Sequence, residues 1–409
     1  MRSFLLLAFR NIFRNRRRTI MTLTVTSGGV AALLLAGGFF SYLFWGYRET
    51  TIHNGLGHLQ IYNAEFFRHD ETRALEFGVG DYNAIASAVM HTPHVLGVAP
   101  RIEFFGMVSN GRKSGTYIAT AAIPETERRM GFQPHIVSGH ELSTARDAAD
   151  TEVLIGSGLA RSMNVKSGGG LTLLAVTADG ALNGLDVNVA GIITTGIKEY
   201  DDRVLQLTLP AAQRLLQSDR VTKLVVGLDN TDNTAAVHSA LAAKLGGDSR
   251  FAIREWQEMA PMYQQMVLMF GGIFVFMGVI VFFMVVVSSA NSLMMAMFER
   301  TREIGTMLAM GTPRFWVLSV FVLEGVLTGI LGAICGLTAG NGFIALLNRA
   351  GLQMPPPPGN TTGFPFHAQH VPALMIGVSV LVVVTLALAS IPPAFRASRV
   401  RIVEALAHV

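Results

Sequence analysis

The sequence has little cysteine and little charge. Among its 409 residues Cys335 is the one cysteine, which excludes an intrachain disulfide framework and a cysteine-cluster metal site. Charged residues make up 15% of the chain, whereas a typical soluble domain carries about 25%. Half of the residues are hydrophobic, and the mean hydropathy is +0.42. This composition argues against a purely soluble protein.

Several motifs of enzymes and metal sites are also absent. The sequence holds no G-x-x-x-x-G-K-[ST] phosphate loop and no G-x-S-x-G elbow. His367 and His370 are three residues apart but have no evident third ligand. Glu199, Asp201 and Asp202 form an acidic group that is typical of a solvated turn. We therefore expect no catalysis, no metal site and no cofactor in this chain.

Long stretches without charge are the most prominent feature that is present. A helix needs about 20 apolar residues to cross a hydrocarbon core of about 30 Å. The first stretch is longer than the 7–15 residues usual for the core of a signal peptide, so we expect an uncleaved anchor. The third predicted span carries a single charge, Glu324. The predicted transmembrane helices are 19–47, 262–298, 315–347 and 371–392.

Basic residues gather on one side of these spans. By the positive-inside rule, residues 1–18, the loop 299–314 and the tail 393–409 lie in the cytoplasm. Residues 48–261 and the Pro-rich loop 348–370 then lie outside. The larger outer segment carries 19 basic and 24 acidic residues, and the rest of the chain carries 13 and 4. The basic pI of about 9.4 therefore reports orientation, and we expect no binding of nucleic acid.

The predicted fold is an α-helical membrane protein with four transmembrane helices and a large α+β domain between the first and second. Within 48–261 we expect an α+β subdomain with a β-rich subdomain inserted at about 125–218. Residues 1–18 read either as an amphipathic helix on the inner membrane surface or as a plain basic flank. Five arginines would anchor this segment: Arg10, Arg14, Arg16, Arg17 and Arg18.

The outer domain has a pattern of short strands and helices. We predict strands near 95–108, 114–122, 152–155, 171–177, 186–194, 203–208, 222–228 and 250–254. Helices are predicted near 81–91, 157–163, 210–217 and 233–245. In the outer loop, residues 354–359 read as a stiff polyproline II segment.

The third span carries regularly spaced glycines. Small residues four apart allow membrane helices to approach closely, although glycine is also frequent in membrane helices without such a role. Glu324 is costly at membrane depth, and it is either a functional contact or a side chain that faces protein or the interface. The predicted packing residues are Gly325, Gly329, Gly332, Gly336 and Gly340.

Three segments together resemble a known family. Residues 8–19 read AFRNIFRNRRRT, residues 299–305 and 309–313 read ERTREIG and AMGTP, and residues 394–399 read AFRASR. With the four-span layout, they resemble the permease subunit of ABC transporters of the lipoprotein-releasing and macrolide-exporter type, the mechanotransmission class. The resemblance implies that the loop 299–314 docks on a separate ATPase subunit. The implied coupling residues are Glu299, Arg300, Arg302, Glu303, Ile304, Gly305, Met310 and Gly311.

The resemblance also implies partners and a task. The chain would lie in the bacterial inner membrane and would not itself be an enzyme. It would work with two ATPase subunits that bind Mg-ATP, and with a second permease that is identical or paralogous. The favoured cargo is a lipoprotein or another amphipathic molecule, received by a periplasmic carrier or adaptor. The alternatives are an efflux permease for drugs or peptides and a mechanical regulator of a cell-envelope enzyme.

Overall fold

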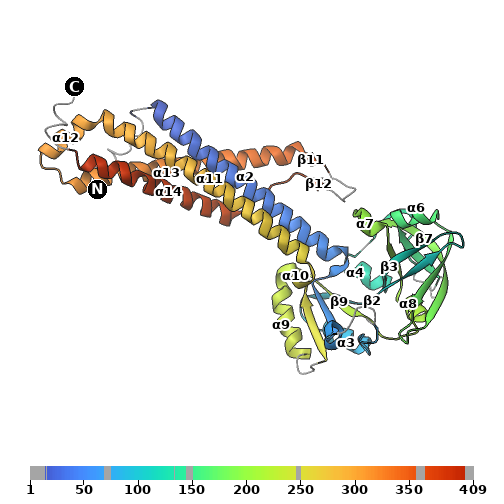
Figure 1. Cartoon of the computed structure of the whole chain (residues 1–409). Helices are drawn as coiled ribbons and strands as arrows, with labels where there is room; N and C mark the ends of the chain where they lie inside the picture. The colour runs from blue at the N-terminus through green and yellow to red at the C-terminus, as the bar shows by residue number, and fades with distance from the viewer. Residues whose placement is uncertain are drawn as a thin grey trace. The chain divides into compact units, whose positions relative to one another are not determined.

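The structure is a computed structural model that describes residues 14, 16–68, 75–132, 134–143, 151–245, 250–355 and 364–400 (Figure 1). The chain divides into two compact units, which are taken separately below. A helical unit is formed by Met1–Trp45, Gln265–Met354 and Pro365–Val409. An α+β unit is formed by Gly46–Gln264 and Pro355–Phe364.

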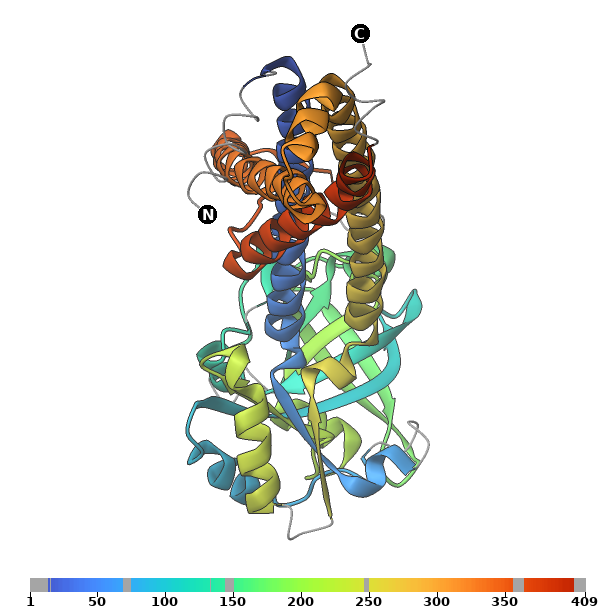
Figure 2. The same ribbon diagram turned by 90° about the vertical axis from the view of Figure 1, so that its left-hand side faces the viewer.

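Long apolar helices make up the helical unit and run side by side in both views (Figures 1 and 2). Within the described residues, four helices are long and apolar enough to cross a membrane, which confirms the predicted fold class. They are α2 (Arg16–Thr51), α11 (Pro261–Glu299), α13 (Arg314–Ala350) and α14 (Pro372–Ser398). The short helix α12 (Thr301–Ala309) lies between α11 and α13.

The helices extend past the predicted spans. Arg16, Arg17 and Arg18 belong to α2 and not to a separate segment 1–18. Helix α14 continues through Pro392 and Pro393 to Ser398, so the predicted tail 393–409 begins as helix. The charge pattern marks where the hydrocarbon ends, whereas a helix continues into the headgroup region wherever its backbone is satisfied.

A seam of aliphatic side chains holds the helices together. Val30 and Leu34 of α2 are buried against Val285 of α11 and against Val382 and Leu386 of α14. Helix α11 is less buried than the other three long helices. Only 6% of its most apolar stretch is buried within the structure, against 33–39% in the others. Its apolar side chains therefore face the surroundings of the unit, as expected of a lipid-exposed helix.

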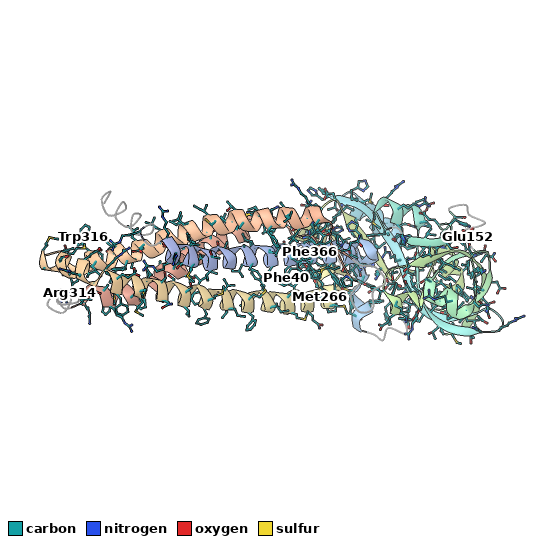
Figure 3. The ribbon with its side chains drawn as sticks, turned by 90° about the horizontal axis from the view of Figure 1, so that it is seen from above. Phe40, Glu152, Met266, Arg314, Trp316 and Phe366 are labelled. Carbon is teal, nitrogen blue, oxygen red and sulfur yellow. The ribbon has the colours of Figure 1, made fainter. Side chains whose placement is uncertain are left out.

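The segment between α13 and α14 is fastened to α2. The ring of Phe366 stacks on Phe39 with centroids 4.7 Å apart. The amide N–H of Gln369 donates to the carbonyl of Gly38 at 3.0 Å, where a side chain at position 38 would meet backbone. Figure 3 shows Phe366 and Phe40 at the same end of the helical unit. Two short strands, β11 (Gln353–Met354) and β12 (Phe364–Pro365), flank this segment.

The α+β unit is built on one long strand that two sheets share. This strand is β2 (Val95–Ser109), and its first half pairs with β9 (Lys223–Leu228). Strand β1 (Leu59–Asn63) lies between β9 and β10 (Phe251–Glu255), and all these pairings are antiparallel. Helices α3 (Tyr82–Met90) and α9 (Thr234–Leu245) bury side chains in the core of this unit.

The second half of β2 belongs to a closed barrel. The strands pair in the order β2-β3-β8-β5-β7-β6, and β6 returns to β2. Closure removes free strand edges and gives an interior that side chains fill. Helix α8 (Leu209–Leu216) buries its apolar face in the same core, and Thr208 caps it by accepting a hydrogen bond from the N–H of Ala211. The strands are β3 (Ser114–Ala122), β5 (Glu152–Gly156), β6 (Gly170–Val176), β7 (Leu182–Thr194) and β8 (Val204–Thr208).

The barrel corrects the predicted limits of the β-rich subdomain. Its wall includes β3 and the second half of β2, so it begins before the predicted boundary at about residue 125. Strand β4 (His135–Gly139), which extends the sheet beyond β7, was not predicted. The remaining short helices are α4 (Pro124–Arg129), α6 (Ser157–Met163), α7 (Lys198–Asp201) and α10 (Trp256–Met259).

The acidic group at α7 is solvated only in part. Glu199 and Asp202 are exposed, as predicted. Asp201 is buried, and its carboxylate accepts hydrogen bonds from the hydroxyls of Thr194 and Thr195 and from the amide of Thr195. The predicted solvation is wrong for Asp201 because these donors at the end of β7 surround its carboxylate.

Candidate functional site

The helical unit has one basic end, which holds the predicted coupling segment. Figure 3 shows Arg314 and Trp316 at this end, opposite Phe40 and Met266. The helix of α11 breaks at Arg300, whose backbone is not helical, and α12 begins at the next residue. A turn with Gly311 at φ +90° then leads to Pro313, the cap of α13. Glycine suits this turn because other residues rarely adopt a positive φ.

Three ion pairs join the coupling segment to distant parts of the helical unit. A nitrogen of Arg14 lies 2.9 Å from a carboxylate oxygen of Glu303, and both side chains are about half exposed. Arg18 of α2 lies 3.0 Å from Glu299 at the end of α11. Arg300 lies 3.4 Å from Glu324 of α13, and each of these side chains is only 6% exposed. Glu324 therefore faces protein, in agreement with one of the two predicted alternatives.

The predicted coupling residues divide into an inward and an outward set. Ile304 is buried with Met297 of α11, Phe321 of α13 and Ala394 of α14. Gly305 and Arg300 are buried beside it. These three residues lie where α12 packs on the other helices, and they are not available to a docking partner in this structure.

The outward set is formed by the exposed residues Glu299, Arg302, Glu303, Met310 and Gly311. Met310 is 79% exposed, which is unusual for a large apolar side chain at the tip of a loop. Phe315 follows at the start of α13 and is 74% exposed. Arg302 and Arg314 are exposed as well. This end therefore presents apolar side chains among positive charges.

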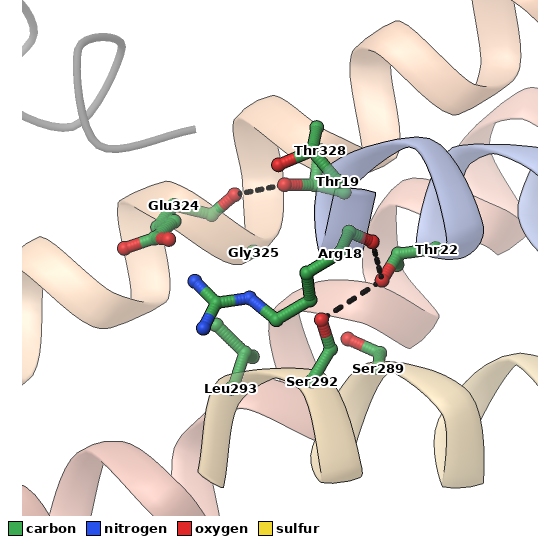
Figure 4. Close-up of a pocket in the computed structure, with 9 residues that line it drawn as sticks. All are labelled: Arg18, Thr19, Thr22, Ser289, Ser292, Leu293, Glu324, Gly325 and Thr328. Carbon is green, nitrogen blue, oxygen red and sulfur yellow. Dashed lines mark hydrogen bonds between the residues drawn. The ribbon is translucent and has the colours of Figure 1, made fainter. Parts of the chain in front are cut away.

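A small polar pocket lies next to the ion pairs (Figure 4). It is lined from α2 by Arg18 and Thr22, from α11 by Ser289 and Ser292, and from α13 by Glu324. The hydroxyl of Thr22 lies 2.9 Å from that of Ser292. Ser289, which is 2% exposed, lines the same pocket. The pocket has a volume of about 20 Å³, so it has room for about one water molecule among these hydroxyls.

The predicted packing glycines of α13 face two different helices. A Cβ atom at Gly325 would lie 2.8 Å from Ser390, and one at Gly329 would lie 3.0 Å from Val383, both on α14. The other three meet α2. Added Cβ atoms would lie 2.6 Å from Thr26 at Gly332, 2.5 Å from Val30 at Gly336 and 3.0 Å from Leu34 at Gly340.

In the α+β unit, the far end of α2 enters the sheet through a tight turn. One π-helical turn, Ile52–Leu56, follows α2, and Gly57 has φ +71°. Arg101 of β2 donates a hydrogen bond to the carbonyl of Gly55 and binds Glu127 of α4 through two nitrogens, one at 2.8 Å. Arg101 is 4% exposed. The turn is therefore tied to the sheet by buried, charge-assisted hydrogen bonds.

A buried histidine extends this junction. The amide N–H of Leu228 donates to Nδ1 of His58, so the proton of the neutral ring is on Nε2, which donates to Thr231. Thr231 in turn donates to Glu49, the carboxylate at the end of α2. Burial, together with the nearby His53, lowers the pKa of His58 to about 4. His58 is therefore neutral at physiological pH.

Some predicted features lie outside the described residues. Arg10 and the rest of the proposed amphipathic helix before Arg14 lie there, as do residues 401–409 of the tail and most of the Pro-rich segment 354–359. Among the described residues no group of three or more His, Cys, Asp and Glu side chains is placed to bind a metal. His367 lies against Tyr42, and His370 hydrogen-bonds Asn341.

These features define a class: a membrane protein with four candidate spans, a large α+β domain after the first span, and a short helix between the second and third. Residues 265–402 match the family model described as FtsX-like permease C-terminal. This part of the chain is therefore an FtsX-like permease domain.

Relatives with established names agree with this assignment. The chain is 23% identical over 345 residues to the lipoprotein-releasing system transmembrane protein LolC of Xylella fastidiosa strain Temecula1, covering 80% of this chain and 81% of that protein. It is 24% identical over 366 residues to the macrolide export ATP-binding/permease protein MacB of Sodalis glossinidius, covering 84% and 53%. The periplasmic region of MacB from Actinobacillus actinomycetemcomitans matches with a TM-score of 0.35 and 14% identity, covering 52% and 95%.

Proposed function

We propose that this chain is the permease subunit of an ATP-driven transporter that releases lipoproteins, or other lipid-anchored or amphipathic cargo, from the bacterial inner membrane. The observation that carries the proposal is the match to a lipoprotein-releasing protein over four fifths of both chains. The basic end of the helices faces the cytoplasm, and the α+β unit is periplasmic. Two permeases, identical or paralogous, work with two ATPase subunits that bind Mg-ATP.

The exposed part of the coupling segment supports docking of an ATPase subunit. Met310 and Phe315 present apolar surface to a partner, and Arg302 and Arg314 flank it with positive charge. Association of such a surface requires an apolar pocket with an acidic rim on the partner. Glu303 lies on the same helix and pairs with Arg14 at this exposed surface.

Export of small molecules is the second candidate function. It is favoured by the match to the macrolide export protein, which covers 84% of this chain. A permease of that kind would work with a periplasmic adaptor, whereas a lipoprotein releaser would hand its cargo to a periplasmic carrier.

Depletion of the protein from cells distinguishes these functions. Under the first proposal, fractionation of the depleted cells shows lipoproteins accumulating in the inner membrane. Unchanged lipoprotein sorting, together with increased sensitivity to an exported compound, would instead support the second candidate.

Reversal of one charge tests the coupling segment itself. Glu303→Lys places a like charge opposite Arg14 and turns the exposed face of α12 more basic. We expect the variant to enter the membrane normally and to lose assembly with the ATPase subunit, as measured by co-purification. Normal assembly and normal ATP hydrolysis by the variant complex would exclude this segment as the docking site.

A further inference from the structure

Arg300 stands at the one point where the backbone between α11 and α12 leaves the helical conformation. Its φ and ψ are −112° and 13°, and its carbonyl accepts the N–H of Ile304 from the first turn of α12 at 2.9 Å. Its side chain crosses to Glu324, which lies 24 residues further along the chain on α13. The turn at Arg300, where α12 begins, is therefore attached to α13 through the carboxylate of Glu324.

This pair is the most buried of the three. Both of its side chains are 6% exposed, whereas those of Arg18 and Glu299 are 16% and 37% exposed, and those of Arg14 and Glu303 are 53% and 55% exposed. Water and salt readily replace the partners of exposed charges, but a buried charge that loses its partner has no replacement. A displacement of α12 can break the exposed pair of Arg14 with Glu303 at little cost, whereas separating Arg300 from Glu324 leaves two charges buried apart from each other.

We propose that the pair of Arg300 and Glu324 is a lock that makes α12 and α13 move as one body. A displacement of the coupling segment is then passed directly into α13, while the exposed pair of Arg14 with Glu303 opens and re-forms. The source of the displacement rests on the proposed function, but the lock itself is a property of this chain alone.

The apolar contacts of Ile304 offer a competing explanation for the attachment of α12. If they alone hold α12, removal of both charges leaves the attachment intact. Replacement of a buried ion pair by apolar side chains of similar size is often neutral or stabilising for the fold. The double variant Arg300→Met with Glu324→Leu therefore separates a lock from a merely structural pair.

The first experiment measures the attachment without any partner. Spin labels are placed at Thr306→Cys on α12 and Ile330→Cys on α13, both on exposed positions, in a Cys335→Ser background. The full chain is studied in lipid nanodiscs by pulsed dipolar spectroscopy. We expect a narrow distance distribution for the parent and at least a twofold broader one for Glu324→Gln and for the double variant. Arg14→Ala should keep the narrow distribution, because its pair is exposed.

The lock is refuted if the double variant, folded by circular dichroism and monodisperse, keeps the narrow distribution of the parent. It is equally refuted if Arg14→Ala broadens the distribution as much as Glu324→Gln does.

A second experiment uses the complex with the ATPase subunit. Labels at Val287→Cys on α11 and Ile330→Cys on α13 report the response of α13 to ATP; both parent side chains are exposed. We expect the ATP-dependent distance change of the parent to be lost in the double variant. If it persists, the lock does not transmit the motion. If the parent forms no complex with an ATPase, the proposed function fails, while the distance widths measured without a partner still decide the lock.

Discussion

The two ends of α2 are held in different ways. In the α+β unit, the turn after α2 is tied by Arg101, which is 4% exposed and bonds both the carbonyl of Gly55 and Glu127. In the helical unit, the basic end of α2 is held by Arg18, which is 16% exposed and pairs with the exposed Glu299, and Arg14, just before α2, forms an exposed pair with Glu303. The end in the α+β unit therefore depends on buried hydrogen bonds, which water does not replace. The basic end depends on ion pairs with exposed carboxylates, which water can replace.

Under the proposed function, this difference suits a helix that transmits motion. An attachment made of buried, charge-assisted hydrogen bonds is rigid and costly to break. Exposed ion pairs contribute little net free energy and re-form with new partners. We infer that the junction at Ile52–Leu56 moves with α2, whereas the contacts of its basic end change during the cycle.

The largest loss of stability is expected from Arg101→Ala, which removes the buried hydrogen bonds that tie the turn after α2. It leaves Glu127 and the carbonyl of Gly55 without their donor, and removal of one partner of a buried pair costs about 3–5 kcal/mol of unfolding free energy. Urea unfolding of the full chain in detergent measures this loss. Trp256 is buried beside Ile52 and serves as the reporter once Trp45 and Trp316 are replaced by Phe.

The control for this change lies on the neighbouring helix α4. Arg128→Ala removes an ion pair with Glu141 in which both side chains are more than 40% exposed, and it should be nearly neutral. Equal losses in the two variants would show that burial does not make the junction strong.

Acid should weaken the same junction. The pKa of His58 is lowered to about 4 in the folded state, from 6.5 in the unfolded chain, so the unfolded state binds more protons between these values. The stability of the α+β unit therefore falls as the pH drops from about 6.5 to about 4, by about 2–3 kcal/mol from this group. The Trp256 signal followed in urea at several pH values measures the slope.

His58→Asn provides the matched comparison, because an amide oxygen can accept the N–H of Leu228 without titrating. The variant should lose most of the pH dependence between 4 and 6.5. A parent and a variant with the same slope would assign the acid sensitivity to other groups.

The contact between α13 and α2 is expected to show an intermediate effect. Gly336→Val puts a branched side chain where a Cβ alone would be 2.5 Å from Val30, and overpacking of this kind costs about 1–3 kcal/mol. Gly342→Val on the same helix has nothing within 4 Å of the added Cβ and should be tolerated. Unfolding in mixed detergent micelles containing dodecyl sulfate, followed by circular dichroism, compares the two. Equal stability of both variants would remove Gly336 from the packing face.

The sequence was sufficient to predict the elements whose signal is local. Charge-free stretches predicted four spans, and alternating apolar residues predicted strands such as β3, because burial imposes these patterns on neighbouring positions. Strand β4 was missed because most of its residues are exposed and carry no alternation. The end of the fourth helix is predicted at residue 392, shortly before the charges of the tail. Helix α14 instead continues to Ser398, because neither Pro392 nor the charges after it end the helix.

The orientation of charged residues could not be predicted. Arg300 and Arg302 lie two residues apart in one charged segment, and nothing in the sequence distinguishes them. Arg300 is nevertheless buried against Glu324, whereas Arg302 is exposed. Their difference arises from the break between α11 and α12 and from the packing of α13, which bring together residues far apart in the chain. Asp201 differs in that its partners, Thr194 and Thr195, are seven and six residues away, and only the fold of the turn after β7 places them around its carboxylate.

The smallest change in stability is expected for Arg14, just before the basic end of α2, and it tests directly whether the two ends of α2 differ. Arg14→Ala removes a pair whose side chains are 53% and 55% exposed, so the unfolding free energy should change by less than about 1 kcal/mol. The small loss should also vanish in high salt, because exposed charges are screened over about 10 Å at 0.1 M ionic strength. Dodecyl sulfate unfolding at low and high salt measures both quantities. A salt-independent loss as large as that of Arg101→Ala would mean that both ends of α2 are rigidly held, and that motion enters the α+β unit by another route.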